Sequence, residues 1–114
     1  MAYDTALAER IRALLGDERD LSEQAMFGGL AFLIGGNMAI AASGEGGLLV
    51  RVDPQQSEAL CAKSNAEPMV MRGRAMAGWL RVDTQDVRTT PQLAKWARIG
   101  TTYARSLPAK KKLR

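Results

Sequence analysis

The 114-residue chain has no histidine and a single cysteine, and these shortages restrict the chemistry open to it. Histidine is the commonest general base and the commonest metal ligand, so its absence removes Ser-His and Cys-His nucleophile pairs. One cysteine cannot build a sulfur-rich zinc site, and it cannot form an internal disulfide, which favours a reducing cytosol. We therefore expect a cytoplasmic protein that is not an enzyme, with no cofactor and no metal ion.

Two side chains remain as candidates for chemistry. Cys61 follows Leu60 in a helix-like stretch, where a free cysteine usually behaves as a small buried hydrophobe. A structural role is the favoured interpretation of Cys61, and a redox or nucleophilic role is the alternative. Glu23 lies close to the first expected strand and is the carboxylate nearest to a buried position.

Long apolar runs are also missing. No stretch approaches the roughly 20 apolar residues of a membrane helix, and charged residues are mixed into the N-terminal segment from Asp4 to Arg12. We therefore expect neither a signal peptide nor a membrane span. The composition, 46% apolar and 25% charged, is that of a folded chain, and the length suits one hydrophobic core. The sequence predicts one domain over residues 1–108 and a basic tail over residues 109–114.

The positive charge is concentrated in that tail. The formal net charge is +4, and the tail alone supplies four positive side chains: Lys110, Lys111, Lys112 and Arg114. The folded body is therefore not basic. The tail could contact phosphates, but a frayed, solubilising chain end is the favoured interpretation.

Three segments have the features of helices. Apolar residues at three- and four-residue spacing predict an opening helix over Asp4–Leu15 and a closing helix from Thr90 to about Leu107. Asp53 followed by Pro54 is a helix-start signal and predicts a short helix to about Ala62.

The remaining apolar segments read as strands separated by turns rich in glycine. They are Ala25–Ile34, Met38–Ala42 and Leu48–Val52, followed after the short helix by Pro68–Met71 and Ala75–Val82. The expected fold class is α+β, with an antiparallel sheet and the order α-β-β-β-α-β-β-α.

The glycine clusters do not match phosphate-binding loops, which place a glycine-rich turn between a strand and a helix. Gly28 and Gly29 fall inside the first expected strand, where glycine usually marks a bulge or a close backbone approach. Arg72 and Arg74 flank an expected turn and could grip an anion, although charge at a hairpin tip commonly serves solubility.

Two tryptophans are more typical of a core than of a cofactor site. Trp79 and Trp96 each have enough apolar surface to anchor the fold.

Several short strings together resemble the TfoX N-terminal domain family over roughly residues 5–107. The strings are Met26-Phe27-Gly28-Gly29, Gly36-Asn37-Met38, Leu49-Val50-Arg51-Val52, Pro68-Met69, Met71-Arg72-Gly73-Arg74, Met76, Gly78-Trp79, and Leu93 with Trp96. The combination is fairly specific, although each string alone is weak.

This resemblance implies a curved antiparallel sheet packed on helices, similar to the type III secretion chaperone architecture. It also implies a regulatory role, because founding members of the family regulate natural competence, are thought to assist a transcription factor, and carry a second, C-terminal domain. We expect this chain to be a single-domain member. The family pattern defines no catalytic residues.

The leading hypothesis is thus a regulatory module that binds a protein, with a transcription factor as one candidate partner. One alternative is a protein associated with nucleic acid through its tail and four arginines: Arg72, Arg74, Arg98 and Arg105. Another is an enzyme or small-ligand-binding domain with a pocket over the sheet. A homodimer is also expected, because a short sheet leaves edge strands that can pair.

Overall fold

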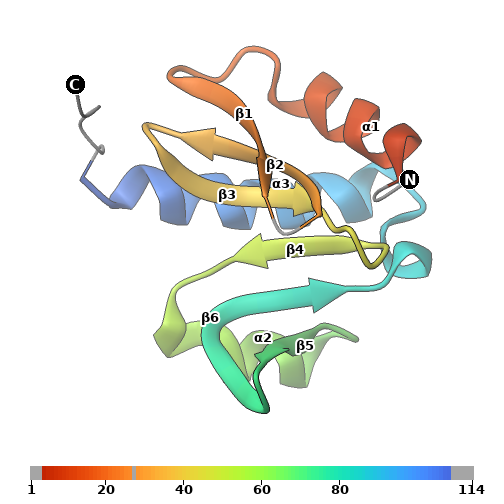
Figure 1. Cartoon of the computed structure of the whole chain (residues 1–114), viewed down its shortest axis with the longest axis vertical. Coiled ribbons are helices and arrows are strands. Elements are labelled where there is room, and N and C mark those ends of the chain that lie inside the picture. The colour runs from red at the N-terminus through yellow and green to blue at the C-terminus, as the bar shows by residue number, and fades with distance from the viewer. Residues whose placement is uncertain (1–3, 27, 109–114) are drawn as a thin grey trace.

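The computed structural model of the chain describes residues 4–26 and 28–108, which form one antiparallel sheet and three α-helices (Figure 1). The helices are α1 (Thr5–Leu15), α2 (Ser57–Lys63) and α3 (Thr90–Ser106), with 3-10 turns at Pro54–Gln56 and Thr84–Val87. The strands are β1 (Leu21–Met26), β2 (Gly29–Ile34), β3 (Asn37–Ala42), β4 (Leu48–Arg51), β5 (Glu67–Met71) and β6 (Arg74–Val82). The expected α+β class and antiparallel sheet are confirmed.

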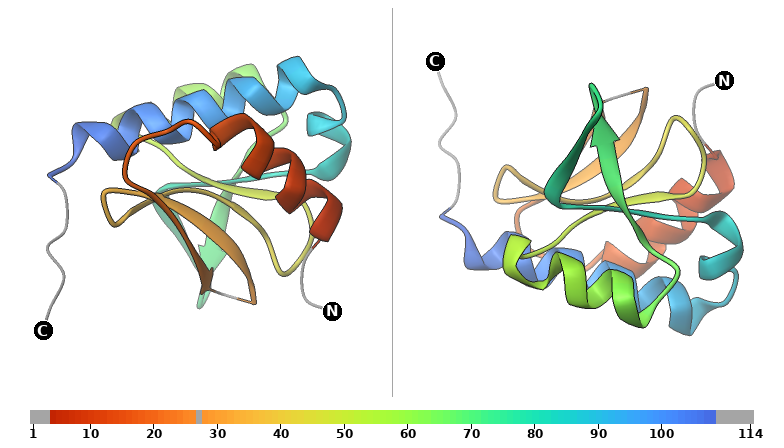
Figure 2. Two further views of the ribbon diagram at one scale, coloured as in Figure 1. Left: turned by 90° about the horizontal axis from the view of Figure 1, so that it is seen from above. Right: turned by 90° about the horizontal axis from the view of Figure 1, so that it is seen from below.

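The six strands lie in the order β1-β2-β3-β4-β6-β5, so hairpins form both edges of the sheet. Figure 2 shows the three helices on one side of the sheet, while the β1–β2 and β5–β6 hairpins project away from them on the other side. The sheet is therefore covered on one face, and it forms a trough between the hairpins on the other.

The order of elements differs from the expected one by a single added strand. β1 pairs with β2 from Leu21↔Ile34 to Met26↔Gly29, so the chain reverses direction where one continuous strand was expected. Gly28 has a φ of 76°, which suits the tight turn that closes this hairpin. The interpretation of Gly28 as a residue inside a strand was wrong.

Gly29 makes the close backbone approach that the sequence suggested. A Cβ at this position would overlap the carbonyl oxygen of Ala42 on the neighbouring strand β3. No bulge occurs at Gly29, and the register of β2 against β3 shifts further along, between Phe32 and Leu33.

Side-chain caps fix the starts of the two long helices. The Asp4 carboxylate accepts a hydrogen bond from the Leu7 N–H at 3.1 Å, and Thr89 and Gln92 form a capping box at the start of α3. Both helices then present an apolar stripe to the sheet.

The main hydrophobic core lies between the helices and the sheet. Its largest fully buried side chains are Phe32, Leu7, Ile11, Ile40, Leu48, Leu80 and Leu93. Each such side chain contributes about 1.5–3 kcal/mol by leaving water. α3 approaches closely at Gly100, where a Cβ would overlap the carbonyl oxygen of Ala39. None of the helices in the described part of the chain is long and apolar enough to cross a membrane.

Candidate functional site

The side of the sheet opposite the helices carries a second apolar cluster, which we call the concave face. Five of its side chains are buried and three are partly buried. They are Ala31, Leu33, Met38, Ala41 and Leu49, with Met26, Met69 and Trp79 packed against them. No described helix belongs to this cluster, so the strands themselves provide its shelter.

Strand geometry explains why these residues share one face. Successive side chains point to opposite sides of a strand. In β2, Phe32 points to the helices and Leu33 to the concave face. In β4, Leu49 belongs to the concave face, whereas Leu48 and Val50 join the main core. The central strands are thus apolar on both sides, which is why their sequences read as continuous hydrophobic runs.

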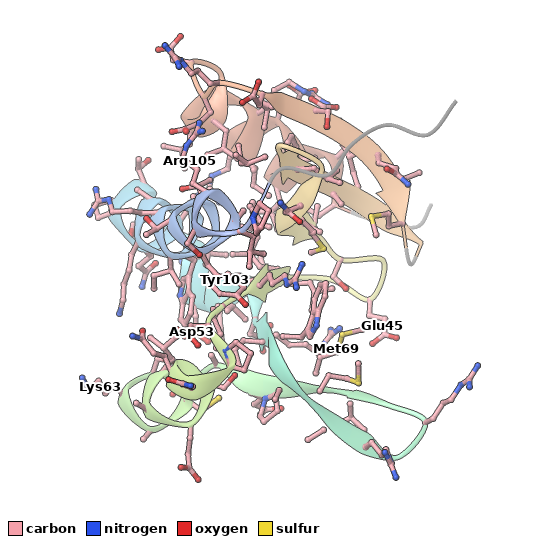
Figure 3. All side chains as sticks on the ribbon, turned by 90° about the vertical axis from the view of Figure 1, so that its left-hand side faces the viewer. Glu45, Asp53, Lys63, Met69, Tyr103 and Arg105 are labelled. Atoms are coloured by element: carbon pink, nitrogen blue, oxygen red, sulfur yellow. The ribbon has the colours of Figure 1, made fainter. Side chains whose placement is uncertain are left out.

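The two edges of the sheet meet over the centre of the concave face. Met26 of β1 and Met69 of β5 lie on opposite edge strands, yet both line one hollow of about 40 Å³ whose floor includes Ala41 and Leu49. Figure 3 shows Met69 and Glu45 between the two hairpins, on the side away from α3. Pockets for small molecules usually measure about 300–1,000 Å³, so the hollow suits the tip of one side chain and is far too small for a cofactor.

An arginine stands at one end of the concave face and is held by two aromatic rings. The guanidinium carbon of Arg51 lies 5.2 Å from the centre of the Trp79 ring and 5.6 Å from that of Tyr103. Trp79 lies opposite Arg51 on β6, and Tyr103 reaches it from α3. Cation–π contacts of this length favour this position of the charge. Arg51 takes part in none of the four ion pairs formed by described residues.

A second arginine, Arg81, lies at the hollow and makes polar contacts. Its guanidinium lies 3.3 Å from the Glu45 carboxylate and 3.4 Å from the Ser43 hydroxyl oxygen. The Glu45 side chain is 82% exposed, so solvent screens this ion pair strongly. Glu67 is the residue paired with Arg81 across β5 and β6, which makes this end of the face mixed in charge.

A larger open depression of about 570 Å³ lies beside Arg81 and is polar and acidic. Its lining includes Glu45, Glu67, Asp83 and Asp86, and Asp86 accepts a hydrogen bond from Asn65 at 3.0 Å. Within residues 4–26 and 28–108, no group of three or more cysteine, aspartate or glutamate side chains is arranged to hold a metal ion. The depression therefore offers carboxylates to solvent.

Cys61 and Glu23, the two sequence candidates for chemistry, lie at opposite edges of the sheet. Cys61 is on α2, which packs on β5 and β6, whereas Glu23 is on β1. Burial, reinforced by the charge of Glu67, raises the pKa of the Cys61 thiol, so the thiolate is disfavoured at neutral pH. The partly buried Cys61 packs against the main core, as its structural interpretation implies.

The expectation that Glu23 approaches a buried position was wrong. Its side chain is 33% exposed and makes hydrogen bonds of 2.6 and 2.8 Å with the Arg12 guanidinium. These hydrogen bonds hold the pKa of Glu23 below its ordinary value. Glu23 is therefore an ionised carboxylate that fastens β1 to α1.

The residues of the family strings do not share one place in the fold. Met26, Met38, Met69 and Trp79 lie on the concave face, whereas Trp96 lies in the main core with 4% of its surface exposed. Gly28, Gly36 and Gly73 lie in the turns of three hairpins, Gly29 begins β2, and Pro68 lies on β5. Phe27 lies outside the described residues. The expectation of a core anchor thus holds for Trp96, while Trp79 is only partly buried.

The four described arginines suggested for nucleic acid lie at two separate places in the fold. Arg72 and Arg74 are exposed at the tip of the β5–β6 hairpin, whereas Arg98 and Arg105 lie on α3. The guanidinium of Arg105 is 2.6 Å from the Glu18 carboxylate. The tail lysines, Lys110, Lys111 and Lys112, lie outside the described residues.

No role was predicted from the sequence for Arg51, Arg81 or Tyr103. Arg51 follows Leu49 by two positions in β4, and Arg81 follows Trp79 by two positions in β6. Two-residue spacing places each pair on one face of its strand, which was the available signal. The contact with Tyr103 depends on the packing of α3 and has no counterpart in the local sequence.

These observations define an α+β domain in which helices cover one face of a curved antiparallel sheet and the other face is an apolar trough with an arginine at one end. The sequence profile of the TfoX N-terminal domain family matches residues 13–104, which is most of the chain. The chain belongs to this family. No curated protein and no solved structure matches it.

Proposed function

We propose that the chain is a non-catalytic, regulatory protein-binding module and that its partner docks on the concave face. The observation that carries this proposal is the second apolar cluster, which lies on the side of the sheet opposite the helices. Most of this cluster is buried, and Met26, Met69 and Trp79 form its partly accessible rim. Accessible apolar side chains gathered in one place are typical of sites that bind another protein.

The types of side chain on the concave face support a protein partner. Methionine is unbranched and polarizable, and it adapts its shape to apolar groups of different outline. Met26 and Met69, both partly buried, line the mouth of the hollow from opposite edges of the sheet. Partly buried Trp79 adds an aromatic ring, a side chain enriched at the centres of protein interfaces.

The titratable groups support a non-catalytic role. Cys61 has a raised pKa and Glu23 is engaged by Arg12, and the two lie at opposite edges of the sheet. A nucleophile and a base must lie within hydrogen-bond reach of each other to act together.

Site-specific cross-linking tests the proposal. A photoreactive residue at Met69 faces the hollow, while the same residue at Val70 points to the other side of the strand and is a matched control. We expect adducts with a particular protein from position 69 and few from position 70. The purified partner should then bind the unmodified chain and fail to bind the Met69→Asp variant, while Val70→Asp retains binding. Equal labelling from both positions would contradict docking on the concave face.

The identity of the cross-linked protein tests the narrower part of the proposal, a role in transcriptional or competence regulation. A transcription factor among the position-dependent adducts would support that role. A metabolic enzyme or a structural protein among these adducts would contradict a role in transcriptional or competence regulation.

A further inference from the structure

We propose that the concave face recognises a partner segment whose apolar and acidic residues are spaced like Leu49 and Arg51, about 7 Å apart along the backbone, with the apolar side chain in the methionine-lined hollow and the carboxylate on Arg51. This inference rests on the proposed function and adds the chemistry of the partner to it.

The first step concerns the hydrogen-bonding capacity of Arg51. The rings of Trp79 and Tyr103 engage its positive charge at 5.2 and 5.6 Å, but a cation–π contact uses none of the five guanidinium N–H donors. The Arg51 side chain donates none of the hydrogen bonds found among described side chains, whereas Arg10, Arg12, Arg81 and Arg105 each donate to a described partner. Arg51 is thus held in position with its donors still available.

The second step concerns the ligand that such an arginine prefers. The guanidinium fork matches the geometry of a carboxylate, and paired N–H donors bind both oxygens at once. Partial burial strengthens this interaction, because Arg51 is less exposed to solvent than a side chain at a hairpin tip. An ordered arginine also loses little conformational entropy on binding, so more of the interaction energy appears as affinity.

The third step concerns spacing along the strand. Leu49 lies at the floor of the hollow and Arg51 follows it by two residues on the same face of β4. Two residues of a strand span about 6.6–6.8 Å. A partner can match this distance with residues i and i+2 of an extended segment, or with residues one turn apart on a helix.

The charge around the hollow gives the docked segment a direction. Arg81 at the hollow already has Glu45 at 3.3 Å and Glu67 opposite it, whereas Arg51 contacts two aromatic rings and forms no ion pair with a described residue. A carboxylate therefore gains more beside Arg51 than beside Arg81. The apolar group belongs at the Arg81 end and the acidic group at the Arg51 end.

A displayed library of random peptides about 15 residues long provides the test, with the intact chain as bait. We expect enriched peptides to share an apolar residue followed or preceded by Asp or Glu at the predicted spacing. Their binding should shift the nuclear magnetic resonance signals of Met69 and of the Trp79 indole. Enriched peptides without a conserved acid would overturn the inference while leaving docking on the concave face intact. If no peptide enrichment depends on Met69, both the inference and docking on the concave face would be overturned.

A double-mutant cycle then isolates the contact with Arg51. Changing the conserved peptide Glu to Gln should weaken binding to the unmodified chain about fivefold or more, and to Arg51→Gln less than about twofold. Arg98→Gln, which removes an exposed arginine of α3, is the matched control and should behave as the unmodified chain. Arg51→Lys should recover only part of the loss, because an ammonium cannot form the paired contact. Equal losses with the unmodified chain, Arg51→Gln and Arg98→Gln would overturn the role of Arg51.

Nucleic acid and a second copy of the chain are two other possible ligands of the concave face, and each would give a distinct result. A random single-stranded oligonucleotide that shifts the Trp79 signal more strongly than the enriched peptides would replace the acidic segment with nucleic acid. Shifts of the same signals with protein concentration alone, together with a doubled mass in light scattering, would assign the face to a second copy of the chain. Neither response should appear if the inference is right.

Discussion

The two faces of the sheet are both apolar, but they are built from different kinds of side chain. The helix-covered face packs Phe32, Leu80 and Leu93 in full burial under α1 and α3. The concave face has Met26, Met69 and Trp79, which are only partly buried. Branched and aromatic side chains in a sealed core specify one packing, whereas methionine adapts to what it meets. The comparison indicates that packing is specified more strictly in the helix-covered core than at the mouth of the hollow, where the partly buried side chains lie.

Replacing a tryptophan on each face should give the largest difference in the free energy of unfolding between the two faces. Trp96→Ala should lower the free energy of unfolding by about 3–5 kcal/mol, because the ring is almost fully buried in the main core. Trp79→Ala should cost only about 1–2 kcal/mol, since the ring is partly exposed and its contact with Arg51 adds a modest amount. Urea denaturation of both variants measures the difference. Equal losses would mean that the concave face is as much a part of the stabilising core as the other.

Adding one carbon atom at Gly100 tests how tightly the helix-covered face is packed. Gly100→Ala should destabilise the chain by about 1–3 kcal/mol, although alanine favours a helix, because the new Cβ would overlap the Ala39 carbonyl oxygen. Thermal unfolding is the measurement. Thr102→Ala, at an exposed position of α3, is the control and should be neutral or slightly stabilising. A stabilised Gly100→Ala variant would show that α3 can move away from β3 at little cost.

Arg12, on the helix-covered side, already has a carboxylate partner in Glu23, whereas Arg51 on the concave face has none among the described residues. The contribution of the Arg12–Glu23 ion pair to stability can be measured. Glu23→Gln should lower stability at pH 7 by less than about 1 kcal/mol, because both side chains are partly exposed. The pKa of Glu23 is lowered in the folded state, so its contribution is present above the ordinary carboxyl value of about 4.3 and is lost as the pH falls further.

The difference in stability between the unmodified chain and Glu23→Gln should therefore be smaller at about pH 3 than at pH 7. Denaturation curves of both proteins at the two pH values measure this difference. Asp17→Asn, in the exposed loop after α1, is a control for the change in net charge. A difference that grows on acidification would contradict the sign of this linkage.

The smallest effect should come from exchanging similar side chains. Met69→Leu should change the free energy of unfolding by less than about 0.5 kcal/mol, because its site at the hollow is open on one side. Leu80→Met in the sealed core should cost about 1 kcal/mol. Careful equilibrium denaturation can separate these values. The reverse order would indicate that the hollow, and not the core, has the stricter shape.

The sequence predicted the fold where local signals were strong. Asp4 and Thr89 cap helices whose apolar spacing was already clear, and the turn at Arg72 and Gly73 lies where the glycine suggested it. β1 was missed because its residues, LSEQAM, include no β-branched or aromatic side chain, and the middle four are exposed. An edge strand of this kind depends on its pairing with β2 more than on its own composition.

The concave face was not predicted from the sequence, and the reason differs from that for β1. Its members come from β1, β2, β3, β4, β5 and β6, and the meeting of Met26 with Met69 depends on the curvature of the whole sheet. The family strings included several of these residues but gave no indication that they share a surface. The aromatic support of Arg51 likewise needs α3 to be placed before Tyr103 can reach it.

The pairing of β4 with β6 has a consequence for when the concave face exists during folding. All other neighbouring strands in the sheet are also neighbours along the chain, whereas this pair is separated by α2 and β5. Leu49 lies opposite Arg81, and Arg51 opposite Trp79, across this one junction. Contacts between distant segments are slow to form, so strands β1–β4 and the β5–β6 hairpin can each be structured before the concave face is complete. A partner that binds across the junction would hold the halves together, and its capture would then report that synthesis and folding of both halves have finished.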